Sequence, residues 1–119
     1  MTSSALASRL VALAAVLTAT LGGPRTADAD WLTPKEIARV MSGRAREIRH
    51  LCWEQASTHT PTSVRVDFIV APSGKVTSAE AKDAAGDAKI VACVVAEVKR
   101  TEFPKTDGGG ANHWPFVFK

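Results

Sequence analysis

Apolar residues in the first half of the chain recur at the spacing of an amphipathic helix. A helix start is indicated by Thr33 as a cap, Pro34 at the first helical position and Glu36 three residues after the cap. We predict a helix from Pro34 to about Ser57. At 100° per residue, Trp53 falls outside the apolar stripe. The stripe itself contains Ile37, Val40, Met41, Ala45, Ile48, Leu51, Cys52 and Ala56.

Two later stretches alternate apolar and polar residues with the period of a half-buried strand. The first runs from Val64 to Val70, and the turn Ala71 to Gly74 leads into a second predicted strand, Lys75 to Lys82. The same alternation returns from Trp114 to Phe118. Because Pro115 has no N–H for a ladder, this last strand is predicted to be an edge strand with Pro115 on its free side.

A second helix is predicted between these strands. Asp83 to Gly86 is expected to be a loop and Asp87 a helix cap, after which apolar residues recur at helical spacing up to about Arg100. The run is rich in β-branched residues, so a strand is the competing interpretation, but its length and spacing favour a helix. Cys93 lies on the flank of its apolar stripe. The element order is helix, strand, strand, helix, strand, which is an α+β chain.

The N-terminal residues resemble an export signal. Arg9 precedes the apolar run Leu10 to Leu21, and Ala27 and Ala29 are small residues at the two positions that signal peptidase reads, which predicts cleavage after Ala29. Residues 1–29 are therefore predicted to be a signal peptide and residues 30–119 a single domain, periplasmic or secreted. The run is shorter than the roughly twenty residues that cross a bilayer, so a retained membrane anchor is the weaker alternative. Membrane contact is expected only through a retained leader.

Cys52 and Cys93 in an exported domain most simply form one disulfide. If both helices lie on one side of a sheet, a bridge is possible, although the pattern does not prove it. Closing a loop of about forty residues would contribute about 3 to 4 kcal/mol to the stability of the domain. The alternative is a thiol oxidoreductase, which needs a reactive thiolate beside its resolving thiol, usually as Cys-x-x-Cys. The wide spacing disfavours it.

Other chemistry finds little support in the sequence. His50, His59 and His113 lack metal-ligand spacing, and the acidic residues form no obvious acid and base pair. Gly108 to Gly110 is not followed by the Lys-Ser/Thr of a phosphate loop. The formal charge of +3 falls to +2 without the leader, and nucleic-acid binding is not predicted. No metal, cofactor or small-molecule substrate is predicted.

Short motifs follow one another in a fixed order over nearly all of residues 32–119. They are Cys52-Trp53-Glu54, the hairpin Val64 to Val76, Val91-Ala92-Cys93-Val94, Phe103-Pro104, the triple Gly, and Trp114-Pro115-Phe116-Val117-Phe118. In this order they resemble the TonB-like C-terminal domain in its two-cysteine form, the AgmX/PglI C-terminal domain of envelope proteins. The resemblance implies a two-layer fold, with two helices packed on a three-stranded antiparallel sheet. It also implies a disulfide between Cys52 and Cys93.

The same resemblance implies a non-catalytic interaction module of the cell envelope whose last strand accepts a segment of a partner protein or peptide. Here this applies to Asn112, His113, Trp114, Pro115, Phe116, Val117 and Phe118. The chain departs from the family in two respects. Ser63 replaces a Gly that often precedes the first strand. A membrane helix and a long Pro-rich spacer are also absent, so energy transduction is not supported.

Several alternatives stay open. Pro115 and Lys119 could instead block pairing at the last strand. A basic and aromatic patch on the first helix would suit an acidic partner or anionic envelope polymer, against the simpler interpretation of a solvated face with the tryptophan packed on a loop. The chain could also be a small exported enzyme whose site forms only in the fold, or a purely structural domain. The patch residues are Arg46, Arg49, His50 and Trp53.

Overall fold

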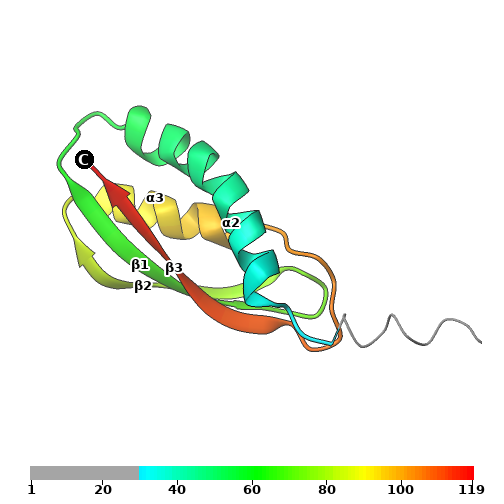
Figure 1. The fold of residues 1–119 in the computed structure, drawn as a ribbon. Helices are drawn as coiled ribbons and strands as arrows, with labels where there is room; N and C mark the ends of the chain where they lie inside the picture. Colours follow the sequence, from blue (N-terminus) through cyan, green and yellow to red (C-terminus); the bar gives the residue numbers. More distant parts are fainter. Residues whose placement is uncertain (1–29) are drawn as a thin grey trace, which may run out of the picture.

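The computed structural model describes residues 30–119, so the predicted signal peptide and its cleavage site lie outside the described residues. The strands form one antiparallel sheet in the order β2-β1-β3, and both helices pack on one side of it (Figure 1). The predicted α+β fold, with its order α-β-β-α-β, is confirmed. The elements are α2 (Pro34–Ile48), the π-helical turn η3 (Arg49–Glu54), β1 (Thr62–Val70), β2 (Val76–Ala85), α3 (Ala88–Lys99) and β3 (Gly110–Phe118).

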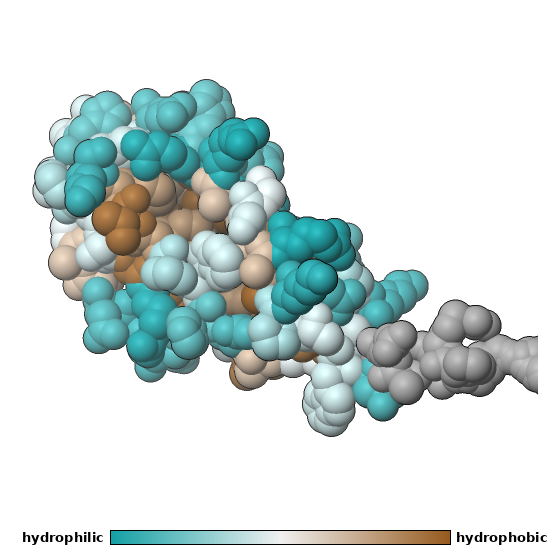
Figure 2. Space-filling view, viewed as in Figure 1, coloured by the Kyte–Doolittle hydropathy of each residue, from teal (hydrophilic) through white to brown (hydrophobic). Residues whose placement is uncertain are grey.

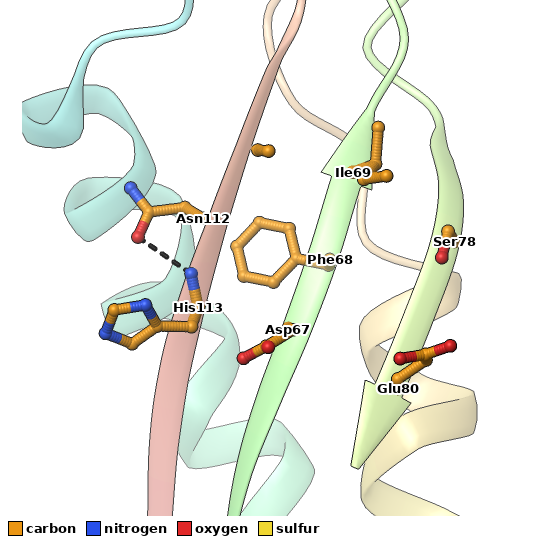
Figure 3. A pocket seen from close by; sticks show the side chains of 8 residues that line it. Asp67, Phe68, Ile69, Ser78, Glu80, Asn112 and His113 are labelled. Carbon is orange, nitrogen blue, oxygen red and sulfur yellow. Dashed lines mark hydrogen bonds between the residues drawn. The ribbon is translucent and has the colours of Figure 1, made fainter. Parts of the chain in front are cut away.

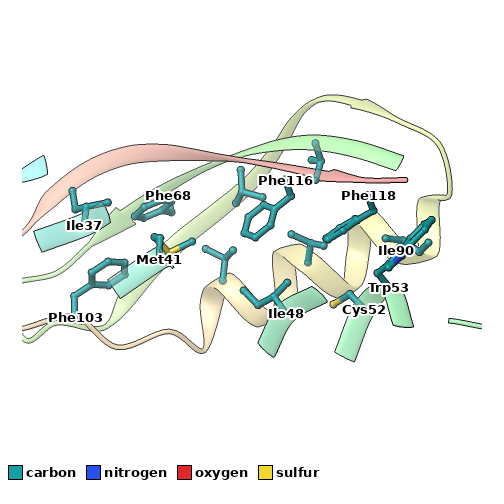
Figure 4. Packing of buried hydrophobic residues seen from close by; sticks show 14 of the residues in the cluster. Ile37, Met41, Ile48, Cys52, Trp53, Phe68, Ile90, Phe103, Phe116 and Phe118 are labelled. Atoms are coloured by element: carbon teal, nitrogen blue, oxygen red, sulfur yellow. The ribbon is translucent and has the colours of Figure 1, made fainter. Parts of the chain in front are cut away.

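The hydrophobic core fills the space between the helices and the sheet (Figure 4). Every second residue of the central strand β1 is buried, which is the alternation predicted from the sequence. Phe68 of β1 stacks on Phe103, with ring centroids 5.7 Å apart. The helices contribute residues from one face each, among them Ile37, Met41 and Ile48 of α2 and Ile90, Val94 and Val98 of α3.

Both helices begin at the predicted residues. At α2 the Thr33 hydroxyl accepts a bond from the Glu36 backbone N–H (3.2 Å), and the Glu36 carboxylate accepts from the Thr33 N–H (3.5 Å). At α3 the Asp87 carboxylate accepts from the Lys89 N–H at 2.8 Å. This bond, followed in importance by one from the Thr58 hydroxyl, lowers the pKa of Asp87 below its ordinary value of 3.8.

The first helix ends in a π turn, which the sequence did not predict. The Gln55 N–H donates to the carbonyl of His50, five residues back, at 3.2 Å. The extra residue in this turn changes which side chains face the core. Trp53 is buried beside Cys52, whereas Leu51 is 37 % exposed. The predictions that Leu51 is buried and Trp53 is not were therefore wrong, because they assumed α-helical spacing as far as Ser57.

The second strand is longer than predicted and includes most of the expected loop. β2 continues to Ala85, although Asp83 has a positive φ of 52°. The register pairs Arg65 with Lys82 and Ser63 with Ala85, so β2 has one extra residue between these pairs. That residue forms a β-bulge, which accommodates the unusual backbone angle of Asp83 without ending the strand.

Candidate functional site

The two cysteines form the disulfide that links the helices. Cys52 of η3 and Cys93 of α3 are bonded with their Cα atoms 5.5 Å apart, across 41 residues of sequence. Cys52 is buried and Cys93 is half-buried, as the helical stripes predicted. A hollow of about 210 Å³ lies beside them, bordered by Leu51 and Ile90. The bridge is consistent with an oxidising, extracytoplasmic location.

A polar cluster provides a second link between α2 and α3. The Arg44 guanidinium donates to the Glu97 carboxylate and to the Glu97 carbonyl, each at 3.0 Å, and to the Thr101 hydroxyl at 3.2 Å. Arg100 donates to the other carboxylate oxygen of Glu97 at 2.7 Å. Glu97 is buried, and these donors satisfy its carboxylate. The cluster is therefore best explained as a structural contact and not as a reactive site.

The last strand lies at an edge of the sheet, as predicted, and pairs with β1 in an unbroken register from Thr62–Phe118 to Val70–Gly110. The His113 N–H donates to the Asn112 side-chain oxygen at 2.7 Å, so it is turned away from β1 (Figure 3). Alternate residues of a strand direct their backbone groups to the same side. The nitrogen of Pro115 therefore faces the free edge, as the sequence predicted.

This free edge of β3 is poor in hydrogen-bond donors. Of the four residues whose backbone faces outward, His113 already donates to Asn112, and Pro115 has no N–H. Donors remain only at Ala111 and Val117, although the carbonyl groups are available along the edge. The Val117 side chain lies on the outer face and is 59 % exposed, while the large aromatic residues of β3 turn toward the helices. These are Trp114, Phe116 and Phe118.

Within residues 30–119 no helix packs on the outer face of the sheet, which contains an open hollow of about 450 Å³ (Figure 3). Asp67 and Glu80 border the hollow from β1 and β2, and Ile69 within it is 49 % exposed. Arg65 lies 3.0 Å from Asp67, and Lys82 lies 3.4 Å from Glu80. This surface was not predicted, although Asp67 and Glu80 are polar residues of the two predicted strands that border it.

The four residues of the predicted basic and aromatic patch do not form one surface. Trp53 is buried, and its ring stacks on Phe118 with centroids 5.7 Å apart and contacts His59 edge-on at 4.9 Å. This corresponds to the alternative in which Trp53 packs on a loop. The reason is the π turn, which rotates Trp53 away from Arg46 and toward the core. The His50 ring lies 3.1 Å from the Glu54 carboxylate, and Arg49 lies 3.9 Å from it.

One face of the molecule carries a cluster of apolar side chains. In the view of Figure 2, apolar side chains gather at the left, with polar side chains above and below them. Within residues 30–119 there is no group of three or more His, Cys, Asp or Glu side chains that could hold a metal ion. None of the helices in the same range is long and apolar enough for a membrane crossing.

Comparisons with models of known families, with curated proteins and with solved structures found no match for this chain.

Proposed function

We propose that this chain is a non-catalytic protein-interaction module of the bacterial cell envelope with a TonB-like fold. The observation that carries the proposal is the sheet, whose outer face is not covered by any other part of residues 30–119 and which places β3 at its edge. The disulfide between Cys52 and Cys93 supports an oxidising compartment such as the periplasm. The ordered motifs that resemble TonB-like domains support the same assignment.

The polar groups of the outer face favour recognition over catalysis. The carboxylate of Asp67 accepts from Arg65, and that of Glu80 lies beside Lys82, so each has a cation within hydrogen-bond or near hydrogen-bond distance. A general base works best when it is free to take a proton from a substrate held in a closed site. The hollow here is open, and it is better suited to the side chains of a polypeptide lying across the strands.

We propose that the partner is an extended segment that lies along β3. It would accept hydrogen bonds from the N–H groups of Ala111 and Val117 and donate to the outward carbonyl groups of the strand. Because His113 and Pro115 offer no free N–H, the segment can form only some of the backbone hydrogen bonds of a regular strand pair. Side-chain contacts with the exposed Val117 must therefore supply part of the affinity. A polar segment without apolar side chains would bind poorly.

Site-specific photo-crosslinking in the native envelope tests the proposal. A crosslinking amino acid at Val117 is expected to give a discrete adduct with a partner, whereas one at Gly43, which lies on α2 with open space around it, is the matched control. Asn112→Ala frees the N–H of His113 and is expected to increase the yield of the Val117 adduct several-fold, because the edge then has a third donor. No adduct from Val117, or equal adducts from both positions, would contradict the proposal.

A further inference from the structure

The opposite edge of the sheet, β2, has a short stretch of regular and uncovered strand. Within the described residues β2 forms its ladder with β1 alone, and an isolated bridge joins Lys75 to Glu102 just before β2 begins. Irregularities interrupt the register near both ends of β2, which leaves Ser78 to Lys82 in unbroken pairing with β1. Residues 80–85 are all exposed. The free edge therefore offers about five regular residues to another strand.

The directions of the backbone groups in this stretch follow from the bond at His113. Because the His113 N–H points away from β1, its cross-strand neighbour Asp67 directs its own N–H and C=O groups toward β2, where it pairs with Glu80. Lys82 and Ser78, two residues on either side, also bond to β1. The N–H and C=O groups of Ala79 and Ala81 consequently point to the free edge.

The charges around Ala81 are self-complementary. Glu80 and Lys82 lie on the same outer face of β2, with their charged groups 3.4 Å apart. If two copies of the strand pair in antiparallel fashion with Ala81 opposite Ala81, each Glu80 lies opposite the Lys82 of the second copy. Opposite charges directly across a pair of strands are stabilising. Centring the pair on Glu80 or on Lys82 would instead place like charges opposite each other.

The helix side of the same edge is apolar and has small side chains on the strand. Val91 and Val95 are half-buried and lie one turn apart on α3, on the flank opposite Cys93 and Glu97, which contact η3 and α2. Since α3 packs on both β2 and β1, and its other flank faces η3 and α2, we place this flank on the β2 side of the helix. Ala81 pairs with the buried Val66, so its side chain is also on this side. A second copy could pack its own alanine and valines here.

We infer that two copies of this chain associate through β2, in an antiparallel pairing centred on Ala81 that joins their sheets into one of six strands. The contact combines two backbone hydrogen bonds at Ala81, two Glu80–Lys82 pairs and the apolar flanks of both α3 helices. In this register only Glu80 to Lys82 of each copy pair within the regular stretch, because Ala79 then lies opposite Asp83 in the irregular part of β2. The interface is therefore short, and interfaces below about 1,200 Å² in total are usually weak. The association leaves β3 free, so it goes beyond the proposed function and does not depend on it.

Sedimentation velocity of the oxidised protein over a wide concentration range tests this inference. The wild-type protein is expected to shift from monomer to dimer as its concentration rises. Lys82→Glu is expected to weaken the dimer about tenfold or more, because carboxylates then face each other across the strands. The exchange Glu80→Lys/Lys82→Glu restores both opposite-charge pairs and should restore the dimer. A monomer at every concentration, or no rescue by the exchange, would overturn the inference.

A proline placed on each edge distinguishes the two edges of the sheet. Ala81→Pro removes a free-edge N–H without removing a bond to β1, so it should abolish the dimer while thermal unfolding confirms that the fold is kept. Val117→Pro is the matched change on β3 and should leave the dimer intact. A dimer lost with Val117→Pro and kept with Ala81→Pro would overturn the inference. Failure of the proposed function is detected separately, through the crosslinked adduct at Val117.

Discussion

Reduction of the disulfide between Cys52 and Cys93 should remove a large share of the stability of this domain. The bridge closes a loop of 41 residues that contains β1, β2 and the first half of α3. In the chain-entropy model a loop of this length contributes about 4 kcal/mol. Small domains are stable by roughly 5 to 15 kcal/mol, so reduction is expected to leave a marginally stable protein.

Urea unfolding followed by tryptophan fluorescence measures this loss, because Trp53 is buried and changes environment on unfolding. With an m value of about 1 to 1.5 kcal/mol per molar urea, a loss of about 4 kcal/mol lowers the midpoint by roughly 3 M. The control is Cys52→Ala/Cys93→Ala, whose midpoint should not respond to reductant. A shift smaller than about 0.5 M on reduction of the wild-type protein, at equal m values, would refute the loop-closure reasoning.

Three further changes test individual contacts. Gly74→Ala should lower the free energy of unfolding in urea by about 2 kcal/mol, because φ at Gly74 is 92° and the new Cβ would lie 2.1 Å from the Phe103 carbonyl oxygen. Gly43→Ala is the control on α2: its Cβ would enter open space, so the change should raise the free energy of unfolding by about 0.5 to 1 kcal/mol. Arg44→Met should lower the free energy of unfolding by about 2 kcal/mol, because it removes hydrogen-bond donors to the buried Glu97. In a double-mutant cycle measured by urea unfolding, this loss should be smaller when Glu97→Gln is already present. The pKa of Asp87 is lowered in the folded state, so the stability from its ionised form is complete above the ordinary value of 3.8 and is lost as pH falls through the lower folded-state pKa. Asp87→Asn should therefore flatten the fall of the urea midpoint in this acidic range.

The parts of the fold that could be predicted from the sequence are those with local physical signals. The capping box at Thr33, the turn at Gly74 and the edge position of Pro115 each depend on a few adjacent residues, and each is present in the structure. The fold class could be predicted because apolar residues recur every two positions in a half-buried strand and about every 3.6 positions in an amphipathic helix. The π turn at η3 has no comparable signal, since it arises from packing against the rest of the fold. Its burial of Trp53 could therefore not be predicted.

The candidate surfaces were less predictable for a related reason. Pairing directions and bulges depend on how strands from different parts of the chain align, so the donor-poor edge of β3 becomes evident only from the bond at His113. The alternation of Glu80, Ala81 and Lys82 was visible in the sequence. Its meaning depends on knowing that β2 is an edge strand and that Ala81 faces outward, which the pairing with β1 establishes.

The π turn connects the disulfide to the end of β3. Cys52 is bonded to α3, and the adjacent Trp53 stacks on Phe118, whose neighbour Val117 is the exposed residue at the proposed binding edge. A bridge that anchors η3 therefore also limits the movement of the aromatic surface on which the last strand lies. An α-helical turn at this position would direct Trp53 away from the core and leave Phe118 without its stacking partner. The disulfide thus supports, through packing, the position of Phe118 beside the proposed binding edge.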